Sequence, residues 1–185
     1  MNVLILSGSR NPEGQTAQAC EALAEGIRAG GGQSKTVFLP ALRIERCRQC
    51  DAQGWGLCRT EARCVIEEDD FTALLGEMRS AEAVVCATPV YFGDLSESLR
   101  ALLERVRRVC RHVPDKNPLA GKPAVGVAVA GGGGGGSYSC LTSLERMLST
   151  CGLDVLDLVP VRRQNLPMKR AVLRVVGQWL AQAKV

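Results

Sequence analysis

Short apolar segments rich in β-branched residues alternate with longer helix-like segments, and this alternation constrains the fold more than any other feature. The apolar segments are residues 3–6, 36–39, 83–87, 124–130 and 155–159, and the helix-like segments are residues 16–29, 71–80, 95–110, 139–150 and 168–183. Nearly continuous apolar strands are typical of a parallel sheet covered on both faces. The sequence therefore predicts an α/β three-layer sandwich around a five-stranded parallel sheet.

Length and composition fit one domain over residues 1–185, with a cysteine-rich loop at about residues 40–70. Of the 185 residues 46% are hydrophobic and 23% are charged, and the net charge of +4 is too small to favour a nucleic-acid partner. We expect no signal peptide, because the first residues lack a basic n-region and reach only a few apolar residues before Ser7. We expect no membrane partner, because no apolar run approaches the roughly 20 residues of a membrane span. Nine cysteines without an export signal favour a reducing compartment, and we expect the cytoplasm.

The loop that follows the first predicted strand has the pattern of an anion site. A helix N-terminus offers unpaired backbone N–H groups and a partial positive charge, which stabilise a bound anion. Further donors and one cation come from the side chains of Ser7, Ser9, Gln15, Thr16 and Arg10. The alternative is a polar turn that binds nothing.

Two common nucleotide motifs are excluded at this loop. Five residues separate Gly8 from Gly14, and Gln15 follows, so the spacing does not match a Walker loop. The G-x-G-x-x-G fingerprint of dinucleotide-binding folds is also missing from this segment. The anion site is therefore of another kind.

Two further loops are unusual, and a strand order of 2-1-3-4-5 would bring both to the first one. Residues 88–94 combine Thr88 and Pro89 with two adjacent aromatics, Tyr91 and Phe92, and residues 131–136 are six consecutive glycines. Ligands of open α/β sheets bind at the carboxyl ends of the strands, where the strand order reverses. The aromatics alternatively pack under the next helix, and the glycines alternatively form a flexible tip. Together the three loops describe a pocket for flavin mononucleotide (FMN).

These motifs resemble, in matching order over residues 1–160, the NADPH-dependent FMN reductase family and especially its iron-sulfur flavoprotein branch. The resemblance implies a flavodoxin-like fold, a phosphate held by Ser9, Gln15 and Thr16 with help from Arg10, and an isoalloxazine ring along residues 89–93. The glycine loop would close over or beside the ring. The candidate FMN-binding residues are Ser7, Ser9, Arg10, Gln15, Thr16, Thr88, Pro89, Val90, Tyr91, Phe92, Gly93, Gly131, Gly132 and Gly133. By analogy with the family we expect a homodimer or homotetramer.

The iron-sulfur branch carries a compact cysteine motif after the second strand, and the loop here contains Cys47, Cys50, Cys58 and Cys64. Four thiolates complete the ligand shell of a four-iron, four-sulfur (4Fe–4S) cluster. The gap between Cys50 and Cys58 is seven residues, longer than the compact motif has. Three interpretations stay open: a 4Fe–4S cluster, no metal, or zinc, which prefers two close-set cysteine pairs. The five other cysteines fit small buried residues.

The expected activity is that of an FMN-dependent oxidoreductase with no acid or base side chain in a catalytic role. With a cluster, the protein would pass electrons between a protein such as a ferredoxin and an acceptor. Without one, an NAD(P)H-dependent flavin or quinone reductase is favoured. The alternative outside enzymes is a flavodoxin-like electron carrier or flavin-binding module, against which the net positive charge argues mildly.

Overall fold

The structure is a computed structural model that describes residues 1–112 and 117–183. Its sheet has five parallel strands in the order β2-β1-β3-β4-β5, as predicted. The strands are β1 (Asn2–Ser7), β2 (Gln33–Phe38), β3 (Ala83–Pro89), β4 (Pro123–Ala130) and β5 (Asp154–Arg162). Strand β1 lies between β2 and β3, so the chain direction across the sheet reverses there, and this reversal opens a crevice at the carboxyl ends.

Helices connect these strands and differ from the predicted segments only by a few residues at their ends. They are α1 (Gln15–Ala29), α2 (Leu57–Thr60), α3 (Phe71–Ser80), α4 (Glu97–Arg111), α5 (Ser137–Thr150) and α6 (Leu166–Gln182). Two short 3-10 turns, η1 (Leu39–Ala41) and η3 (Arg163–Asn165), complete the described elements. The short helix α2 was not predicted, because its four residues carry no measurable helical period.

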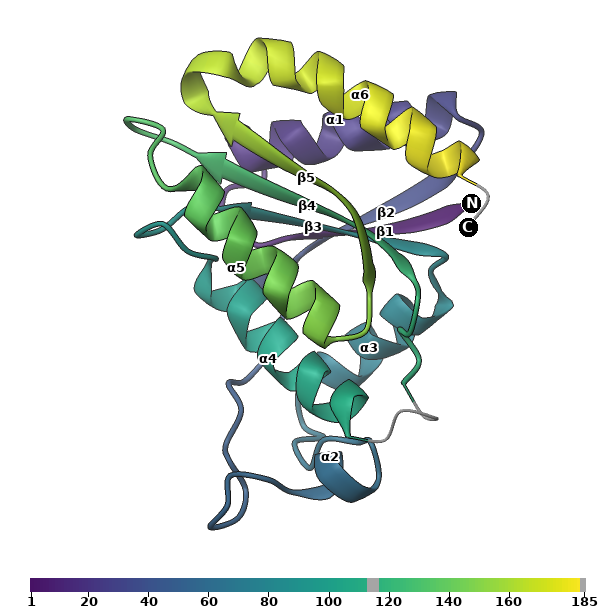
Figure 1. The fold of residues 1–185 in the computed structure, drawn as a ribbon, viewed down its shortest axis with the longest axis vertical. Helices are drawn as coiled ribbons and strands as arrows, with labels where there is room; N and C mark the ends of the chain where they lie inside the picture. Colours follow the sequence, from purple (N-terminus) through teal and green to yellow (C-terminus); the bar gives the residue numbers. More distant parts are fainter. Residues whose placement is uncertain (113–116, 184–185) are drawn as a thin grey trace.

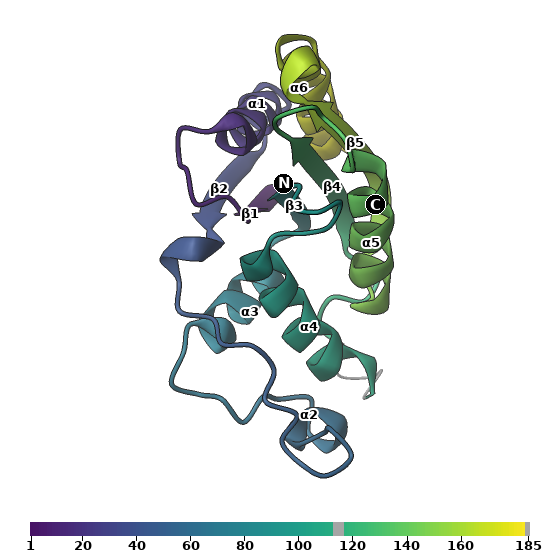
Figure 2. The ribbon, with the colours of Figure 1, turned by 90° about the vertical axis from the view of Figure 1, so that its left-hand side faces the viewer.

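The helices form one layer on each face of the sheet (Figures 1 and 2). One face packs against α3, α4 and α5 through Leu4, Leu6 and neighbouring apolar side chains. The other face packs against α1 and α6 through Val3 and Ile5. Successive side chains of a strand point to opposite faces, so a continuous apolar strand is buried on both sides. The flavodoxin-like three-layer sandwich is thus confirmed.

Helices α1 and α6 cross closely at two glycines. A Cβ atom at Gly26 would lie 2.1 Å from the carbonyl oxygen of Arg174, and one at Gly177 would lie 2.3 Å from that of Leu23. Backbone therefore meets backbone at this crossing, and neither position has room for a side chain.

The cysteine-rich loop of about residues 40–70, called the cysteine-rich segment from here on, lies outside the sandwich. It is at the far end of α4 from the sheet's carboxyl edge (Figures 1 and 2). It holds α2 and otherwise irregular backbone. Long connections of this kind inside an α/β domain are commonly functional.

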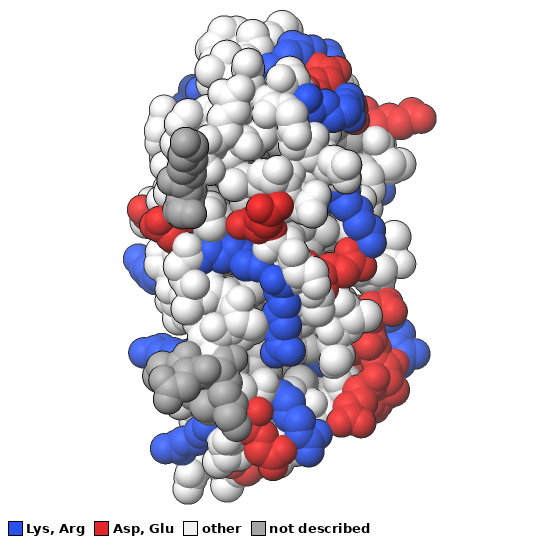
Figure 3. Space-filling model, turned by 90° about the vertical axis from the view of Figure 1, so that its right-hand side faces the viewer, with Lys and Arg blue, Asp and Glu red and all other residues white. Residues whose placement is uncertain are grey.

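No helix among the described residues is long and apolar enough to cross a membrane. On the face in Figure 3, Lys and Arg side chains are interspersed with Asp and Glu. This mixture agrees with the small net charge of +4.

Candidate functional site

The loops after β1, β3 and β4 meet around one open cavity at the carboxyl edge of the sheet. The volume of the cavity is about 530 Å³. Its lining residues are Ser9, Asn11, Gly14, Gln15, Thr16, Pro89, Val90, Tyr91, Val129, Ala130, Gly131, Gly132 and Gly135. The three loops that the sequence singled out are thus brought together in space.

The start of α1 forms one wall of this cavity. Gly14 precedes the helix in extended conformation, and no side chain of the described residues caps it. The N–H groups of the first turn have no partners within the helix, which makes this end attractive to an anion. Thr16 is 3% exposed and faces the same cavity, and the loop before it is shaped by Asn11, whose Oδ1 accepts the backbone N–H of Glu13 at 2.9 Å.

The other walls are held together by contacts between the aromatic loop and the glycine loop. The N–H of Val90 donates to the carbonyl of Val129 at 3.0 Å, and the hydroxyl of Ser139 donates to the carbonyl of Gly93 at 2.9 Å. A Cβ at Gly136 would lie 2.7 Å from the Cα of Gly93, and both glycines have positive φ. Only glycine satisfies both the close approach and the backbone conformation at these two positions.

Three other glycines of the run have a different relation to the cavity. A Cβ at Gly131, Gly132 or Gly135 would meet nothing within 4 Å. These residues border the cavity without filling it, so a flat ligand can approach their backbone. The cavity walls therefore fit the two parts of FMN, an anionic phosphate and a flat ring system.

Six of the fourteen candidate residues do not line this cavity. Ser7 and Thr88 are fully buried, and Thr88 Oγ1 accepts the N–H of Ser96 at 2.9 Å, so its hydroxyl fixes the start of α4. Arg10 lies in a neighbouring cavity beside α4 and pairs with Glu97 at 3.2 Å. The remaining three are Phe92, which borders that neighbouring cavity, and Gly93 and Gly133.

Five lining residues were not among the candidates: Asn11, Gly14, Val129, Ala130 and Gly135. The Asn11-Pro12 pair is a turn signal that was available in the sequence. Val129 and Ala130 end a buried strand, and their sequence resembles that of any other strand end.

Three aromatic side chains project from the rim of the site into solvent. Tyr91 is 51% exposed, Tyr138 is 66% exposed, and Phe92 is completely exposed with a φ of 52°. The alternative interpretation, that the loop aromatics bury under the next helix, is therefore wrong for Phe92. A positive φ is uncommon for a bulky side chain, and here it turns the ring outward.

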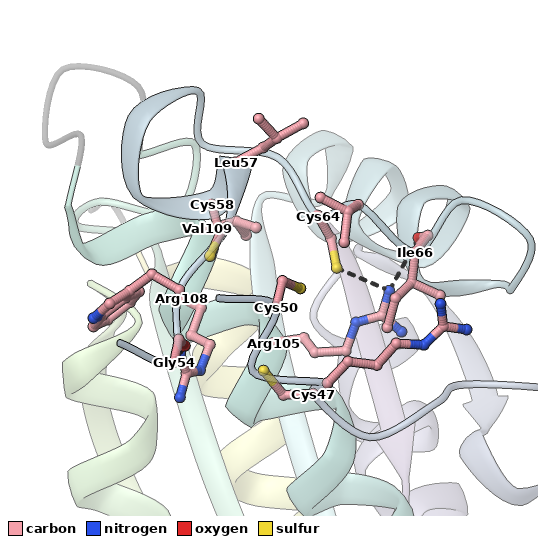
Figure 4. A pocket seen from close by; sticks show the side chains of 14 residues that line it. Cys47, Cys50, Gly54, Leu57, Cys58, Cys64, Ile66, Arg105, Arg108 and Val109 are labelled. Atoms are coloured by element: carbon pink, nitrogen blue, oxygen red, sulfur yellow. Dashed lines mark hydrogen bonds between the residues drawn. The ribbon is translucent and has the colours of Figure 1, made fainter. Parts of the chain in front are cut away.

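All four candidate metal ligands line a second pocket, between the cysteine-rich segment and α4 (Figure 4). The pocket is narrow, with a volume of about 20 Å³, and Cys47, Cys50, Cys58 and Cys64 border it together with Arg48, Arg105 and Arg108. Within the described residues, no three Cys, His, Asp or Glu side chains already stand at metal-binding distances. The thiols share one pocket without forming a finished ligand set.

Burial raises the pKa of the Cys50 thiol, and the negative charges of Cys47, Cys64 and Cys58 raise it further. The other three thiols are thus near enough to Cys50 to disfavour its ionisation, and a bound cation would relieve that repulsion.

The cysteines outside the pocket are of another kind. Cys20, Cys86, Cys110, Cys140 and Cys151 are buried, as expected. Burial raises the pKa of Cys20 and of Cys86 to about 12, so these thiols stay protonated and inert.

Two arginines of α4 hold the cysteine-rich segment in place. Arg108 donates to the carbonyl of Gly54, and its guanidinium lies 4.7 Å from the centre of the Trp55 ring. Arg105, one helical turn earlier, donates to the Sγ of Cys64 at 3.3 Å (dashed in Figure 4). Both contacts tie the segment to the sandwich.

The sheet order, the uncapped helix start and the glycine wall together define a flavodoxin-like protein with a nucleotide-type cavity at the strand-order reversal. Residues 1–166 match the NADPH-dependent FMN reductase family. The chain therefore belongs to this family, and the resemblance expected from its motifs is confirmed.

Curated relatives include iron-sulfur flavoproteins of archaea. One from Methanocaldococcus jannaschii is 30% identical over 131 residues, which cover 71% of this chain and 65% of the relative. One from Archaeoglobus fulgidus is 31% identical over 107 residues, which cover 58% of this chain and 49% of the relative. The chain thus spans about half to two thirds of the length of these relatives.

Solved structures share the fold. An NAD(P)H:quinone oxidoreductase from Methanothermobacter marburgensis superposes with a TM-score of 0.75 at 20% identity, over 97% of this chain and 96% of the other. A flavodoxin variant from Pseudomonas aeruginosa gives a TM-score of 0.60 at 14% identity, over 98% and 97%. At these identities the similarity establishes the flavodoxin-like fold alone.

Proposed function

We propose that the protein binds FMN in the cavity between the loops after β1, β3 and β4 and acts as an FMN-dependent oxidoreductase. The observation that carries this proposal is the meeting of an uncapped helix start, an aromatic loop and an open glycine wall around one cavity. Family membership supports the same cofactor.

In this proposal the phosphate is held at the first turn of α1 by backbone N–H groups and by Ser9, Gln15 and Thr16. The ring lies between residues 89–91 and the glycine loop, whose backbone approaches it without intervening side chains. Bound FMN would supply both hydride and single-electron chemistry. The protein binds and orients the ring, and no side chain of the cavity is assigned a proton transfer.

Anaerobic purification followed by absorbance spectroscopy tests the cofactor. We expect flavin bands near the usual positions, or stoichiometric uptake of added FMN by flavin-free protein. Protein that has neither bands nor uptake would exclude the proposal.

NAD(P)H is the proposed electron donor, and a quinone or free flavin is the proposed acceptor. The solved quinone oxidoreductase with the same fold supports this choice. Oxidation of NADPH and NADH by the FMN-loaded protein, followed at 340 nm with a quinone acceptor, tests it. An absence of turnover with both nucleotides would instead favour the electron-carrier alternative or a protein donor such as a ferredoxin.

We also propose that the pocket of Cys47, Cys50, Cys58 and Cys64 binds a 4Fe–4S cluster. Four thiols around one pocket match the required donor set, and arginines at the same pocket offset negative charge. The similar iron-sulfur flavoproteins support the assignment. The thiols are not yet a finished ligand set and the pocket has a volume of only about 20 Å³, so the segment must rearrange around a cluster when it binds.

Iron and sulfide analysis after anaerobic reconstitution distinguishes the three interpretations of this pocket. We expect about four iron and four sulfide per chain for a cluster. Cys58→Ser should lower both, whereas Cys140→Ala, which removes a buried thiol on α5, should not. Zinc without sulfide, or no metal at all, would overturn the cluster and leave the FMN proposal standing.

A homodimer or homotetramer remains our proposal for the assembly. The exposed rings of Tyr91, Phe92 and Tyr138 beside the cavity support it, since a second copy would remove them from water. Light scattering of the wild type and of Phe92→Ser tests this, and a monomeric wild type would contradict it.

The free thiols are in keeping with a reducing compartment such as the cytoplasm.

A further inference from the structure

Arg105 is a charged side chain inside the core. Its side chain is 1% exposed, and it lies on α4 among Leu102, Leu103 and Val106, which are fully buried. Burying a charge is unfavourable unless partners compensate it. The partners of Arg105 therefore show which segments of the chain its charge holds together.

The partners of Arg105 come from both ends of the cysteine-rich segment. One amino group donates to the carbonyl of Glu45 at 3.2 Å, two residues before Cys47. The other donates to the carbonyl of Ile66 at 3.2 Å, two residues after Cys64. A single guanidinium thus joins the two ends of the segment that carries all four pocket cysteines.

Asp69 completes this junction. Its carboxylate accepts from both amino groups of Arg105 and from the backbone N–H of Glu45 at 2.8 Å. Its side chain is 0% exposed, and the Phe71 ring covers the guanidinium at 4.0 Å. The charge of Arg105 is therefore fixed in place and shielded from water.

The same amino group that reaches Ile66 also donates to the Sγ of Cys64 at 3.3 Å. N–H donors to a ligand sulfur, and positive charge near it, stabilise the more negative, reduced state of an iron–sulfur cluster. Arg108 borders the same pocket but donates to a carbonyl at the tip of the segment, so its contact lacks this feature.

We propose that Arg105 is a positioning residue for the metal centre: it closes the base of the cysteine-rich segment and donates a hydrogen bond to the Cys64 ligand, which raises both the retention and the reduction potential of the cluster. This inference rests on the proposed cluster and concerns a residue outside the ligand set. Through Arg105, helix α4 acts directly on the metal centre.

The test compares wild type with Arg105→Lys and with the double variant Arg105→Met/Asp69→Asn, all reconstituted anaerobically. The double variant removes both charges of the buried pair, which avoids leaving one of them unpaired. Arg100→Met is the matched control, because Arg100 lies on the same helix, pairs with Asp94 and does not line the pocket. Circular dichroism and FMN binding report on folding in each sample.

Two measurements are made on each protein: the rate of iron release to a chelator, and the midpoint potential of the cluster from an EPR-monitored redox titration. We expect the double variant to lose iron about 10- to 100-fold faster and to titrate at a more negative potential. The midpoint potential of Arg105→Lys should lie between those of wild type and the double variant, because lysine keeps the positive charge. The iron release and cluster potential of Arg100→Met, and the flavin potential of the Arg105 variants, should match wild type.

Unchanged release and potential in folded Arg105→Lys and double-variant protein would overturn the inference and leave the cluster proposal intact. Equal shifts in Arg100→Met would also overturn it, since a general charge effect would then account for the result. Wild-type protein that takes up no iron would overturn this inference together with the proposed cluster. If the double variant does not fold, Arg105→Lys decides by the same two measurements.

Discussion

Arg105 and Asp69 form an ion pair in which both side chains are withdrawn from water, with exposed fractions of 1% and 0%. The pair joins α4 to the end of the cysteine-rich segment, 36 residues away in sequence. Losing one partner of this pair costs more stability than losing one partner of a surface pair, because the remaining buried charge cannot be hydrated.

Asp69→Asn should lower the free energy of unfolding by roughly 3–5 kcal/mol, because it leaves the Arg105 charge buried without a counter-ion. Urea denaturation followed by circular dichroism at pH 7 measures this. The matched control is Glu97→Gln, which breaks the exposed pair with Arg10 and should change little. Equal effects of the two substitutions would contradict the prediction.

The pair also predicts a pH dependence of stability. Burial raises the pKa of Asp69, but hydrogen bonds from Arg105 and from the backbone amides of Glu45 and Phe71 outweigh it, and the net pKa is lowered. A folded pKa below the unfolded value of about 3.9 gives stabilisation that is present above that pH. It is lost as the pH falls through the folded pKa.

Urea unfolding repeated between pH 6 and pH 2 checks this. The stability difference between wild type and Asp69→Asn should be largest near pH 6 and should shrink below about pH 4. A difference that stays constant over this range would rule out the ionised pair as its cause.

Thr16→Val and Ser9→Ala should weaken FMN binding by about 10- to 150-fold each, the usual effect of losing one hydrogen bond to a charged group. Flavin fluorescence titration measures the affinity. Riboflavin, which lacks the phosphate, should bind wild type and variants alike, and Thr142→Val on the exposed side of α5 is the matched control. A parallel loss of riboflavin binding would place these residues away from the phosphate.

Two glycines in helices should respond oppositely to alanine. Gly26→Ala should destabilise the protein, because its Cβ would lie 2.1 Å from the backbone oxygen of Arg174 at the crossing of α1 and α6. The Cβ of an alanine at position 76, on α3, would meet nothing within 4 Å. Gly76→Ala should therefore raise the free energy of unfolding by up to about 1 kcal/mol, because alanine has the higher helix propensity. Thermal unfolding of both variants checks the signs. Stabilisation by both substitutions would contradict the prediction, because it would mean that α1 and α6 can move apart at Gly26 without loss of stability.

Much of the fold was predictable because local patterns carry it. The alternation of apolar segments with helical ones gave five strands and their order of appearance, and glycines at 30–32 and at 152 marked helix ends that the structure confirms. The site was predictable at the level of loops, since parallel strands end at a common edge. Individual residues were predictable only in part, as Arg10 and Asn11 show: adjacent in sequence, they border different cavities.

The sequence by itself determined the layered α/β fold, the family and the three loops of the cavity, because hydrophobic period, turn residues and helix starts are properties of neighbouring residues. Tertiary structure alone decided that the four pocket cysteines lie against α4 and that Arg105 joins both ends of their segment. In sequence Arg105 is one of several arginines on an amphipathic helix. A buried charge is tolerated only where distant segments supply its partners, and those partners meet only when the chain folds.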